Sequence, residues 1–405
     1  MKSKTLSKLL VILIMITLSA FSCKRPETVN RSPEVFEIPA DYLKQAPEIP
    51  DFWVSEYQAV NEFLAKTVKK GKIEVIGTSA GGRKICAVTY GTARQGKGTS
   101  TFSGSLGFGD VKAYRGPDHE KTVYMGMSAV HGGEFEGIVG TVNLISVLET
   151  GKDLRGKEWP LITELSSRID RLILIPIVNP DGRERIPLRM ELYRDTDFTV
   201  AEYLNTGGDD KGKITGWPQI KEFIPMDFSK PGFPGGYPND AGVNIQHDDF
   251  LGNIQPETQA LFDLTAKEKP DLIINMHTGA VFMLMHRPLG EPALMPFFDT
   301  LFSYVHSELA LKGLQYTNDP KEEGNSSRTA TSTYNLDGAL NFHCGALSVV
   351  VESPSHSFSG IRLTQQRKIE EPANLLDAQL TCHQQSMKFL AETGGRSKWL
   401  PGRKR

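Results

Sequence analysis

The chain has 405 residues, which suits one large α/β domain or two ordinary domains. Because 39% of the residues are hydrophobic and 23% are charged, the chain can bury a substantial core, which excludes a disordered or fibrous protein. Its 46 Lys and Arg against 48 Asp and Glu give a formal net charge of −2, without the positive excess of a nucleic-acid-binding domain. Four cysteines are too few for a dense disulfide scaffold.

The first 22 residues are typical of a signal peptide. Lysines precede an apolar run over residues 9–18, which is too short to span a bilayer, and Cys23 follows a small residue shortly after that run. This arrangement resembles the lipidation site of bacterial lipoproteins. We therefore predict export, removal of residues 1–22, and a lipid on Cys23 that anchors the protein in the bacterial cell envelope, facing the periplasm or the cell exterior. A soluble exported protein is the alternative.

The rest of the chain is expected to form one domain. Residues 23–49 contain many Pro and Glu residues and no periodicity, which favours a tether. No internal repeat or second linker follows, so a single domain is predicted over residues 50–393. Residues 394–405 are predicted to form a basic C-terminal tail.

Alternating helical and strand-like segments indicate an α/β fold. Apolar spacing predicts a first helix over residues 52–68 and further helices over residues 136–150 and 256–267. Two strand-like segments follow the first helix, and four nearly continuous apolar runs come later, as expected of strands covered on both faces. The strand segments are 72–77, 84–91, 123–130, 172–178, 272–276 and 347–351. We predict a mostly parallel but mixed, twisted central sheet with helices on both faces.

Polar residues follow directly after the four apolar runs. They are His131 and Glu134, then residues 179–182, then residues 277–279, and finally residues 352–354. In open parallel sheets, ligands bind outside the carboxyl ends of the strands. These groups are therefore expected to converge in one crevice.

The most informative of these groups is the H-x-x-E pair of His131 and Glu134. At this spacing an imidazole nitrogen and a carboxylate oxygen can reach the same ion, although a loop histidine beside a surface glutamate is the commoner case. A second histidine would complete a catalytic zinc site that leaves one position for water. His277 is the candidate, because it ends a buried run as His131 does; His286 and His343 are the alternatives.

The order of these motifs resembles the zinc metallocarboxypeptidases, the family of carboxypeptidase A and B, over roughly residues 50–390. Residues 77–85 resemble the family's G-x-S-x-x-G-R-x-I segment, and residues 179–182 resemble its N-P-D-G loop. The resemblance implies a zinc carboxypeptidase-like fold with one Zn²⁺ per chain. The implied zinc ligands are His131, Glu134 and His277, and Glu352 stands at the position of the family's general base.

The same resemblance implies hydrolysis of an amide bond at or near the C-terminus of a peptide. Glu352 would take a proton from the attacking water and pass it to the leaving amine. Arg194, about a dozen residues after the N-P-D-G loop, would stabilise the oxyanion, with Arg189 as the nearby alternative. Asn179 is expected to bind the substrate, and Tyr334 is the candidate for the family's mobile tyrosine.

One motif departs from the family pattern. Residues 242–250 resemble the substrate motif G-V-D/N-x-N-R-N/D, but Gln246 stands at its Asn and His247 at its Arg. A mostly neutral imidazole cannot replace the bidentate charge that holds a terminal carboxylate, so strict recognition of a free C-terminus is not expected. Three alternatives remain: a cation from another position binds the carboxylate, the substrate is recognised elsewhere, or the activity is reduced. The candidate cations are Arg183, Arg185, Arg287 and Arg328, and Gly133 stands where digestive family members carry an arginine.

The predicted function is therefore that of a zinc-dependent peptide hydrolase. Cell-wall stem peptides and scavenged peptides suit the predicted compartment, and no nucleic-acid partner is expected. The alternatives are a zinc amide deacylase acting on small N-acyl amino acids and a peptide-binding protein of the same fold with weakened catalysis. For Cys86, Cys344 and Cys382, one disulfide with a free thiol and three reduced thiols both stay open.

Overall fold

The computed structural model describes most of the chain from residue 49 onward. The described residues are 49–106, 109, 111–186, 203–209, 213–216, 219–221, 225–229, 232–280, 283–314, 334–354 and 371–401. The predicted signal peptide, Cys23 and nearly all of the predicted tether lie outside these residues. Arg189, Arg194 and Arg328 lie outside them as well.

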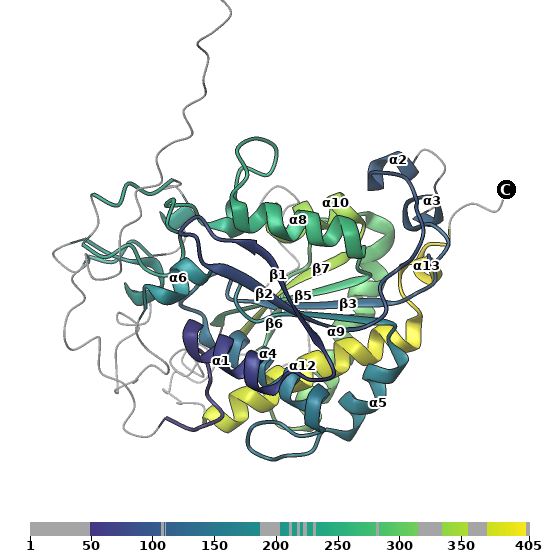
Figure 1. The fold of residues 1–405 in the computed structure, drawn as a ribbon, viewed down its shortest axis with the longest axis horizontal. Helices are drawn as coiled ribbons and strands as arrows, with labels where there is room; N and C mark the ends of the chain where they lie inside the picture. Colours follow the sequence, from purple (N-terminus) through teal and green to yellow (C-terminus); the bar gives the residue numbers. More distant parts are fainter. Residues whose placement is uncertain are drawn as a thin grey trace, which may run out of the picture.

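A seven-stranded mixed sheet forms the centre of the molecule, in the order β1-β2-β4-β3-β5-β7-β6 (Figure 1). The four central strands β4, β3, β5 and β7 are parallel, whereas the outer pairings β1/β2, β2/β4 and β6/β7 are antiparallel. The strands are β1 Lys72–Thr78, β2 Lys84–Gly91, β3 Val123–Ser128, β4 Arg171–Ile175, β5 Leu272–Ala280, β6 Leu284–Met285 and β7 Leu347–Pro354. The predicted sheet is confirmed.

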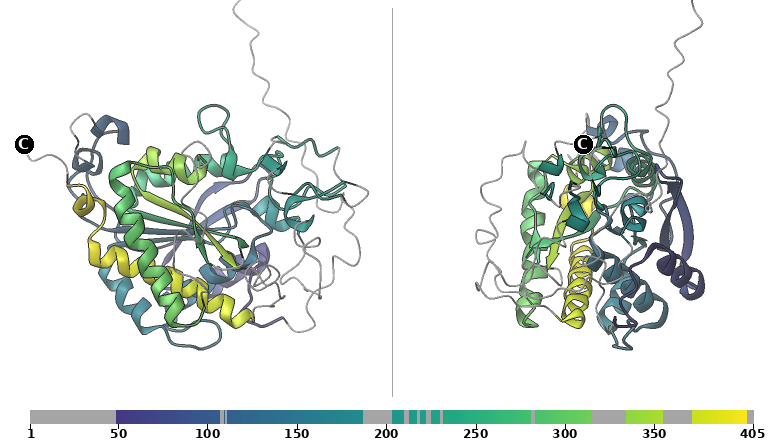
Figure 2. Two further views of the ribbon diagram at one scale, coloured as in Figure 1. Left: turned by 180° about the vertical axis from the view of Figure 1, so that it is seen from behind. Right: turned by 90° about the vertical axis from the view of Figure 1, so that its left-hand side faces the viewer.

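Helices cover both faces of this sheet, as the views in Figures 1 and 2 show. Every residue of β3 and β4 is buried, which explains why these strands appear as continuous apolar runs rather than alternating ones. One face carries α1 Tyr57–Thr67, α4 Phe135–Thr150, α5 Pro160–Arg168, α9 Met295–Leu311 and α12 Pro372–Thr393. The other carries α8 Pro256–Glu268 and α10 Leu336–Cys344.

Short helices lie at the two edges of the sheet. Near its amino edge are α2 Phe102–Leu106, α3 Val111–Arg115 and α13 Arg396–Trp399, and at its carboxyl edge is α6 Pro180–Glu184 (Figure 1). The 3₁₀ turns are η3 Gln219–Lys221, η4 Ile245–His247 and η5 Pro292–Leu294. No helix in the described part of the chain has the length and hydropathy needed to cross a membrane.

Several element boundaries differ from the sequence predictions. Strand β3 ends at Ser128 and β4 at Ile175, before the predicted ends at residues 130 and 178. The first helix begins at Tyr57 rather than at residue 52, because Glu56 is still extended with φ −69° and ψ 142°. Strand β5 continues to Ala280 and β7 to Pro354, beyond the predicted ends at residues 276 and 351. His277 and Glu352 therefore do not follow their strands but lie within them, as paired neighbours in the sheet.

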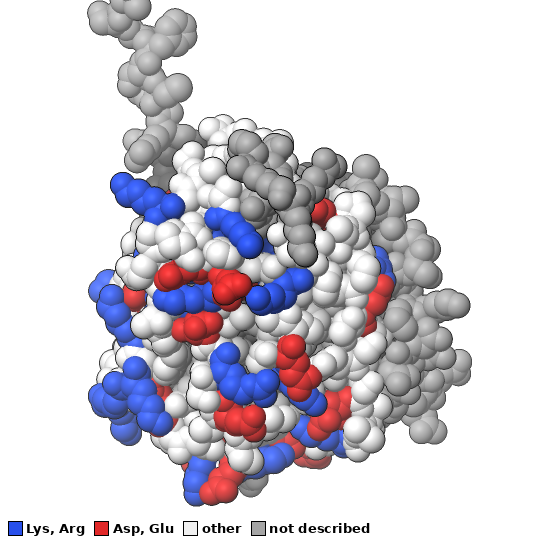
Figure 3. All heavy atoms as spheres, turned by 90° about the vertical axis from the view of Figure 1, so that its right-hand side faces the viewer, with Lys and Arg blue, Asp and Glu red and all other residues white. Residues whose placement is uncertain are grey.

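A buried carboxylate ties together the amino edge of the sheet, opposite the convergent polar groups. Asp271 accepts hydrogen bonds from the side chains of Arg94 and Arg115 and from the backbone N–H groups of Val123 and Arg396. These partners bring the C-terminal helix α13 against the start of β5. On the face of the molecule that carries α2, α3 and α13, acidic and basic side chains are interspersed rather than gathered into patches of one sign (Figure 3).

The three cysteines in the described chain are free thiols. Cys344 and Cys382 are buried, and Cys86 is half-buried. Of the two alternatives left open by the sequence, the structure has three reduced thiols. Burial raises the pKa of Cys344 to about 11 and that of Cys382 to about 12, so both behave as small hydrophobic side chains.

Candidate metal centre

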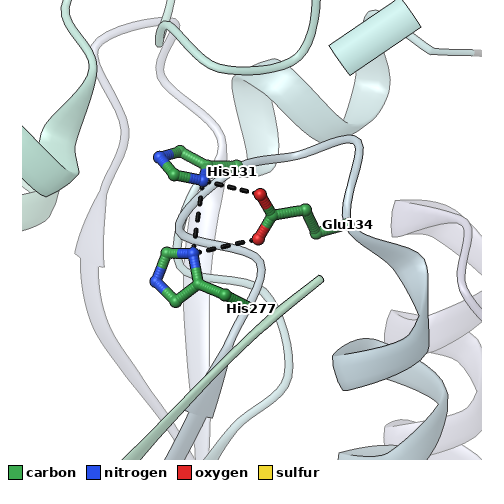
Figure 4. A group of neighbouring side chains, drawn as sticks. All are labelled: His131, Glu134 and His277. Atoms are coloured by element: carbon green, nitrogen blue, oxygen red, sulfur yellow. Dashed lines mark hydrogen bonds and ion pairs between the residues drawn. The ribbon is translucent and has the colours of Figure 1, made fainter. Parts of the chain in front are cut away.

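His131, Glu134 and His277 meet at the carboxyl edge of the central strands (Figure 4). Glu134 bridges the two imidazoles: its Oε1 lies 2.7 Å from Nδ1 of His131, and its Oε2 lies 3.0 Å from Nδ1 of His277. The two Nδ1 atoms are 3.2 Å apart. All three side chains are buried, and one ligand atom from each lies within 4.8 Å of the others. The predicted convergence is confirmed.

Close backbone packing fixes the loop that carries His131 and Glu134. The loop leaves β3 through Ala129, whose φ of 53° is unusual for a residue with a side chain, and Glu134 then precedes α4. A Cβ on Gly132 would lie 2.0 Å from the backbone nitrogen of Arg183, and one on Gly182 would lie 2.1 Å from the carbonyl oxygen of Gly236. Gly132 therefore lets the H-x-x-E loop contact the N-P-D-G loop directly, and Gly182 lets the N-P-D-G loop contact the backbone at Gly236.

Gly133, where digestive family members carry arginine, is equally enclosed. A Cβ at this position would lie 2.6 Å from Oδ1 of Asn205 and 3.0 Å from Cδ1 of Ile186. The segment around Asn205 therefore occupies the space that a side chain at residue 133 would need. Both contacts are ends of side chains, so Asn205 and Ile186 would have to move to admit a side chain at residue 133.

Hydrogen bonds around the centre set the imidazole of His131 for metal binding. Its Nε2 lies 3.1 Å from Oδ1 of Asn244, which can only accept, so Nε2 carries the proton and Nδ1 offers its lone pair to the centre. The ring of Tyr237 stacks on the same imidazole with 3.6 Å between centroids and 8° between planes. The backbone N–H of Thr278 donates to Oε2 of Glu134 at 3.1 Å.

The electrostatics of the group favour a bound cation. Burial would raise the pKa of the Glu134 carboxyl, but the charges of His131 and His277 lower it to about 2. Burial would lower the pKa of His277, but Glu134, with more distant Glu352 and Asp337, raises it to about 9. A buried carboxylate thus needs positive charge beside it. Two neutral imidazole nitrogens and one carboxylate oxygen form a set of donors that suits zinc.

The alternative histidines do not join this centre. Nε2 of His343 lies 2.9 Å from the carbonyl oxygen of Phe262, and its ring stacks on the Phe262 ring. His286 directly follows β6 instead, and its Nε2 lies 3.8 Å from Oε1 of Glu352. Among the described residues, His131, Glu134 and His277 form the one group of three ligand types that could hold a metal ion.

Glu352 lies beside the centre but is less enclosed. In the sheet it is the direct neighbour of His277 on one side and of Leu284 on the other. Its side chain is 22% exposed, whereas the side chains of Glu134 and His277 are 3% and 2% exposed. A carboxylate at this position borders the metal centre and remains accessible to a substrate.

The predicted substrate residues lie in different environments. Oδ1 of Asn179 accepts from the N–H of Gly182 at 2.9 Å, and its Nδ2 donates to the carbonyl oxygen of Tyr237 at 3.1 Å, so this side chain supports the two loops. His247 is half-buried. Tyr334 is 40% exposed and packs edge-on against Phe250. Substrate contact by these residues stays a prediction.

Gln246 takes part in a buried network behind the centre. Its Nε2 donates to Oδ2 of Asp337 at 3.1 Å, and Asn275 donates to the same oxygen at 2.9 Å. Ser348 donates to Oδ1 of Asp337 at 2.6 Å. Asn275 precedes His277 by two residues and shares its face of β5. The amide of Gln246 therefore serves a buried carboxylate of the protein.

The three described arginines that could replace the missing cation have other partners. Arg183 is buried, donates to the carbonyl oxygen of Ser55 and lies over the ring of Phe135. Arg185 is buried and donates to Asp240 at 2.8 Å. Arg287 pairs with the Asp299 carboxylate. Arg183 and Arg185 are thus held in buried contacts, whereas Arg287 pairs at the surface, and binding of a substrate carboxylate by any of them stays a prediction.

Sequence analysis did not identify Tyr237, Asn244 or Asp337. Asn244 lies in the G-V-N segment that resembles the substrate motif, so the sequence could have singled it out. Its contact with His131, however, depends on how the loops fold. Tyr237 and Asp337 carried no signal in the sequence.

Comparison with known proteins assigns this site. A family model described as zinc carboxypeptidase, Peptidase_M14, matches residues 57–343. The chain belongs to the zinc carboxypeptidase family. The matched region includes all three members of the centre, and His131, Glu134 and His277 form the zinc site typical of this family. The match ends before Glu352, so the position of Glu352 rests on the β5/β7 pairing.

Solved structures of carboxypeptidases are similar to this chain, and the first of the two that follow shares its fold. A metallo-carboxypeptidase from Burkholderia cenocepacia aligns with a TM-score of 0.50 at 13% identity, over 82% of this chain and 69% of that chain. A carboxypeptidase A from Helicoverpa armigera gives a TM-score of 0.48 at 15% identity, over 86% of this chain and 76% of that chain. No curated protein matches the chain in sequence.

Proposed function

We propose that this zinc carboxypeptidase hydrolyses the amide bond at or near the C-terminus of exported or cell-wall peptides, with Glu352 as the general base. The observation that carries this proposal is the pairing of His277 with Glu352 across β5 and β7. It sets a partly exposed carboxylate beside three buried metal ligands. Arg194, the expected oxyanion residue, lies outside the described residues.

In the proposed reaction, bound zinc would supply a Lewis acid that acidifies water and polarises the scissile carbonyl. Glu352 takes a proton from the attacking water, whose oxygen forms the new bond to the carbonyl carbon. Glu352 then gives that proton to the amine nitrogen as the C–N bond breaks. Asn244 and Tyr237 hold the His131 ring in place throughout. Arg194 is proposed to stabilise the oxyanion.

Recognition of a free C-terminal carboxylate differs in this member of the family. Gln246 is engaged with Asp337, and His247 stands at the position of the expected arginine. Arg183, Arg185 and Arg287 are engaged elsewhere. These contacts support substrates whose leaving group is not held through a bidentate arginine at residue 247, such as peptides with a blocked or modified terminus.

A direct test combines metal analysis with four substrate classes. Zinc content is measured first, followed by hydrolysis of free-ended peptides, C-terminally blocked peptides, stem peptides containing D-amino acids, and N-acyl amino acids. Glu352→Gln should lower turnover to a small residual rate while zinc stays bound, and the exposed Glu164→Gln variant serves as the control. Protein without zinc would contradict the metal site. Turnover of N-acyl amino acids alone would indicate a deacylase, and bound zinc without turnover would indicate a binding protein.

The proposed envelope location is tested separately. We propose that a lipid on Cys23 holds the protein at a membrane, in keeping with the apolar run before it. Cys23→Ser should release the full-length protein from the membrane fraction and abolish labelling by a radioactive fatty acid. Unchanged fractionation and labelling would refute the anchor and leave the zinc chemistry untouched.

A further inference from the structure

His286 lies at the end of the short strand β6, next to the proposed general base. β6 pairs antiparallel with β7, so that Leu284 is opposite Glu352 and Met285 opposite Val351. The backbone N–H of His286 donates to the carbonyl oxygen of Val350 at 3.0 Å, which continues this pairing by one residue. Because side chains alternate along a strand, His286 shares a face with Leu284 and hence with Glu352.

The two side chains meet on that face. Nε2 of His286 lies 3.8 Å from Oε1 of Glu352, and the side chains are 15% and 22% exposed. At 3.8 Å the pair is within ion-pair range but longer than a hydrogen bond, so a direct hydrogen bond requires the two atoms to come closer. Both groups therefore border the same accessible edge of the site.

The other oxygen of the carboxylate faces a residue without a side chain. A Cβ on Gly279 would lie 3.4 Å from Oε2 of Glu352, with no other atom within 4 Å. One oxygen thus lies next to an imidazole, and the other lies over open backbone at the end of β5. A contact with Oε1 restricts the rotation of the carboxylate and so fixes the direction in which Oε2 points.

We propose that His286 is a positioning residue for Glu352: its ring N–H holds Oε1 so that Oε2 is directed toward the attacking water. This inference rests on the proposed function, because it requires Glu352 to be the base. It does not depend on a charged imidazole, since a neutral ring with its proton on Nε2 can also donate a hydrogen bond to Oε1. Proton transfer itself stays with Glu352.

Kinetics of the zinc-loaded full chain test the proposal. His286→Leu removes the donor and should lower kcat about tenfold or more with KM within about twofold, because a displaced base costs rate and not substrate binding. His286→Gln retains an N–H donor and should recover most of the loss. His343→Leu is the matched control, since His343 also lies near the sheet but contacts Phe262, and it should leave kcat within about twofold.

A double variant separates action through Glu352 from an independent effect. In the Glu352→Gln background, His286→Leu should cause no further loss of residual turnover. The same tenfold loss in both backgrounds would overturn the inference, as would a rise in KM at constant kcat or an unchanged kcat in His286→Leu. Wild-type turnover in Glu352→Gln would instead refute the proposed base, which distinguishes the two failures.

A spectroscopic measurement supplies a readout other than activity. The ring ¹⁵N resonances of His286, assigned by their absence from His286→Gln, should shift when Glu352→Gln is introduced and should not shift in Glu164→Gln. The measurement can be made with and without zinc. Resonances of His286 that do not respond to Glu352→Gln would overturn the inference even if turnover were too slow to measure.

Discussion

Replacing Asn244 should weaken zinc binding without removing any zinc ligand. In Asn244→Leu, Nε2–H of His131 loses the acceptor that lies 3.1 Å away, in a site where both residues are buried. An unsatisfied buried donor costs about 1–3 kcal/mol. The same partner orients the ring and makes Nδ1 more basic, so its loss is expected to raise the zinc dissociation constant about 10- to 100-fold. Asn244→Asp keeps the acceptor and makes His131 more basic, so it should bind zinc at least as tightly.

The assay is a competition titration against a chromogenic zinc chelator, with urea unfolding of the zinc-free protein in parallel. Asn143→Leu is the matched control, because Asn143 is also buried and bonds to backbone groups of Phe52, Val139 and Leu154 in and around α4, away from the centre. The control should lose stability and keep its zinc affinity. If Asn244→Leu kept the wild-type zinc affinity, or if both variants lost affinity equally, the argument for a specific hydrogen bond to His131 would be refuted.

Three further predictions concern the framework of the site. Asp271→Asn should lower the free energy of urea unfolding by about 3–5 kcal/mol, because buried arginines lose their counter-charge, while zinc content stays unchanged. Gly133→Arg should lower the melting temperature and not raise activity, because its Cβ would meet Asn205; a stable, more active variant would contradict the packing. Burial and the charge of Asp181 raise the pKa of Glu257 to about 7, so the stability due to this group should be greatest below about pH 4.5 and be lost as pH rises through about 7. Urea unfolding across pH 4–8 should show this decline in the wild type and a flatter profile in Glu257→Gln.

Several features of the fold could be predicted from the sequence because they are local or depend on burial alone. Strands such as β3 and β4 are covered on both faces, so they appear as continuous apolar runs. The long helix α12 was not among the predicted elements, because it buries polar residues such as Gln379 and His383, which obscure its apolar periodicity. The two-residue strand β6 is too short to produce a pattern.

The sequence by itself determined the types of ligand, their order and the edge of the sheet where they gather. His131 and Glu134 are close in the chain. The parallel strands β3 and β5 have their carboxyl ends at the same edge of the sheet, which brings His277 to the same place. Only the tertiary structure decided what surrounds these groups. The contacts of Asn244, Tyr237 and Asp337 join segments far apart in the chain, and the nearness of His286 to Glu352 follows from the register of β6 on β7. Such contacts depend on the packing of distant loops and on the register of β6, and a strand of two residues is too short for its hydrophobic pattern to set that register.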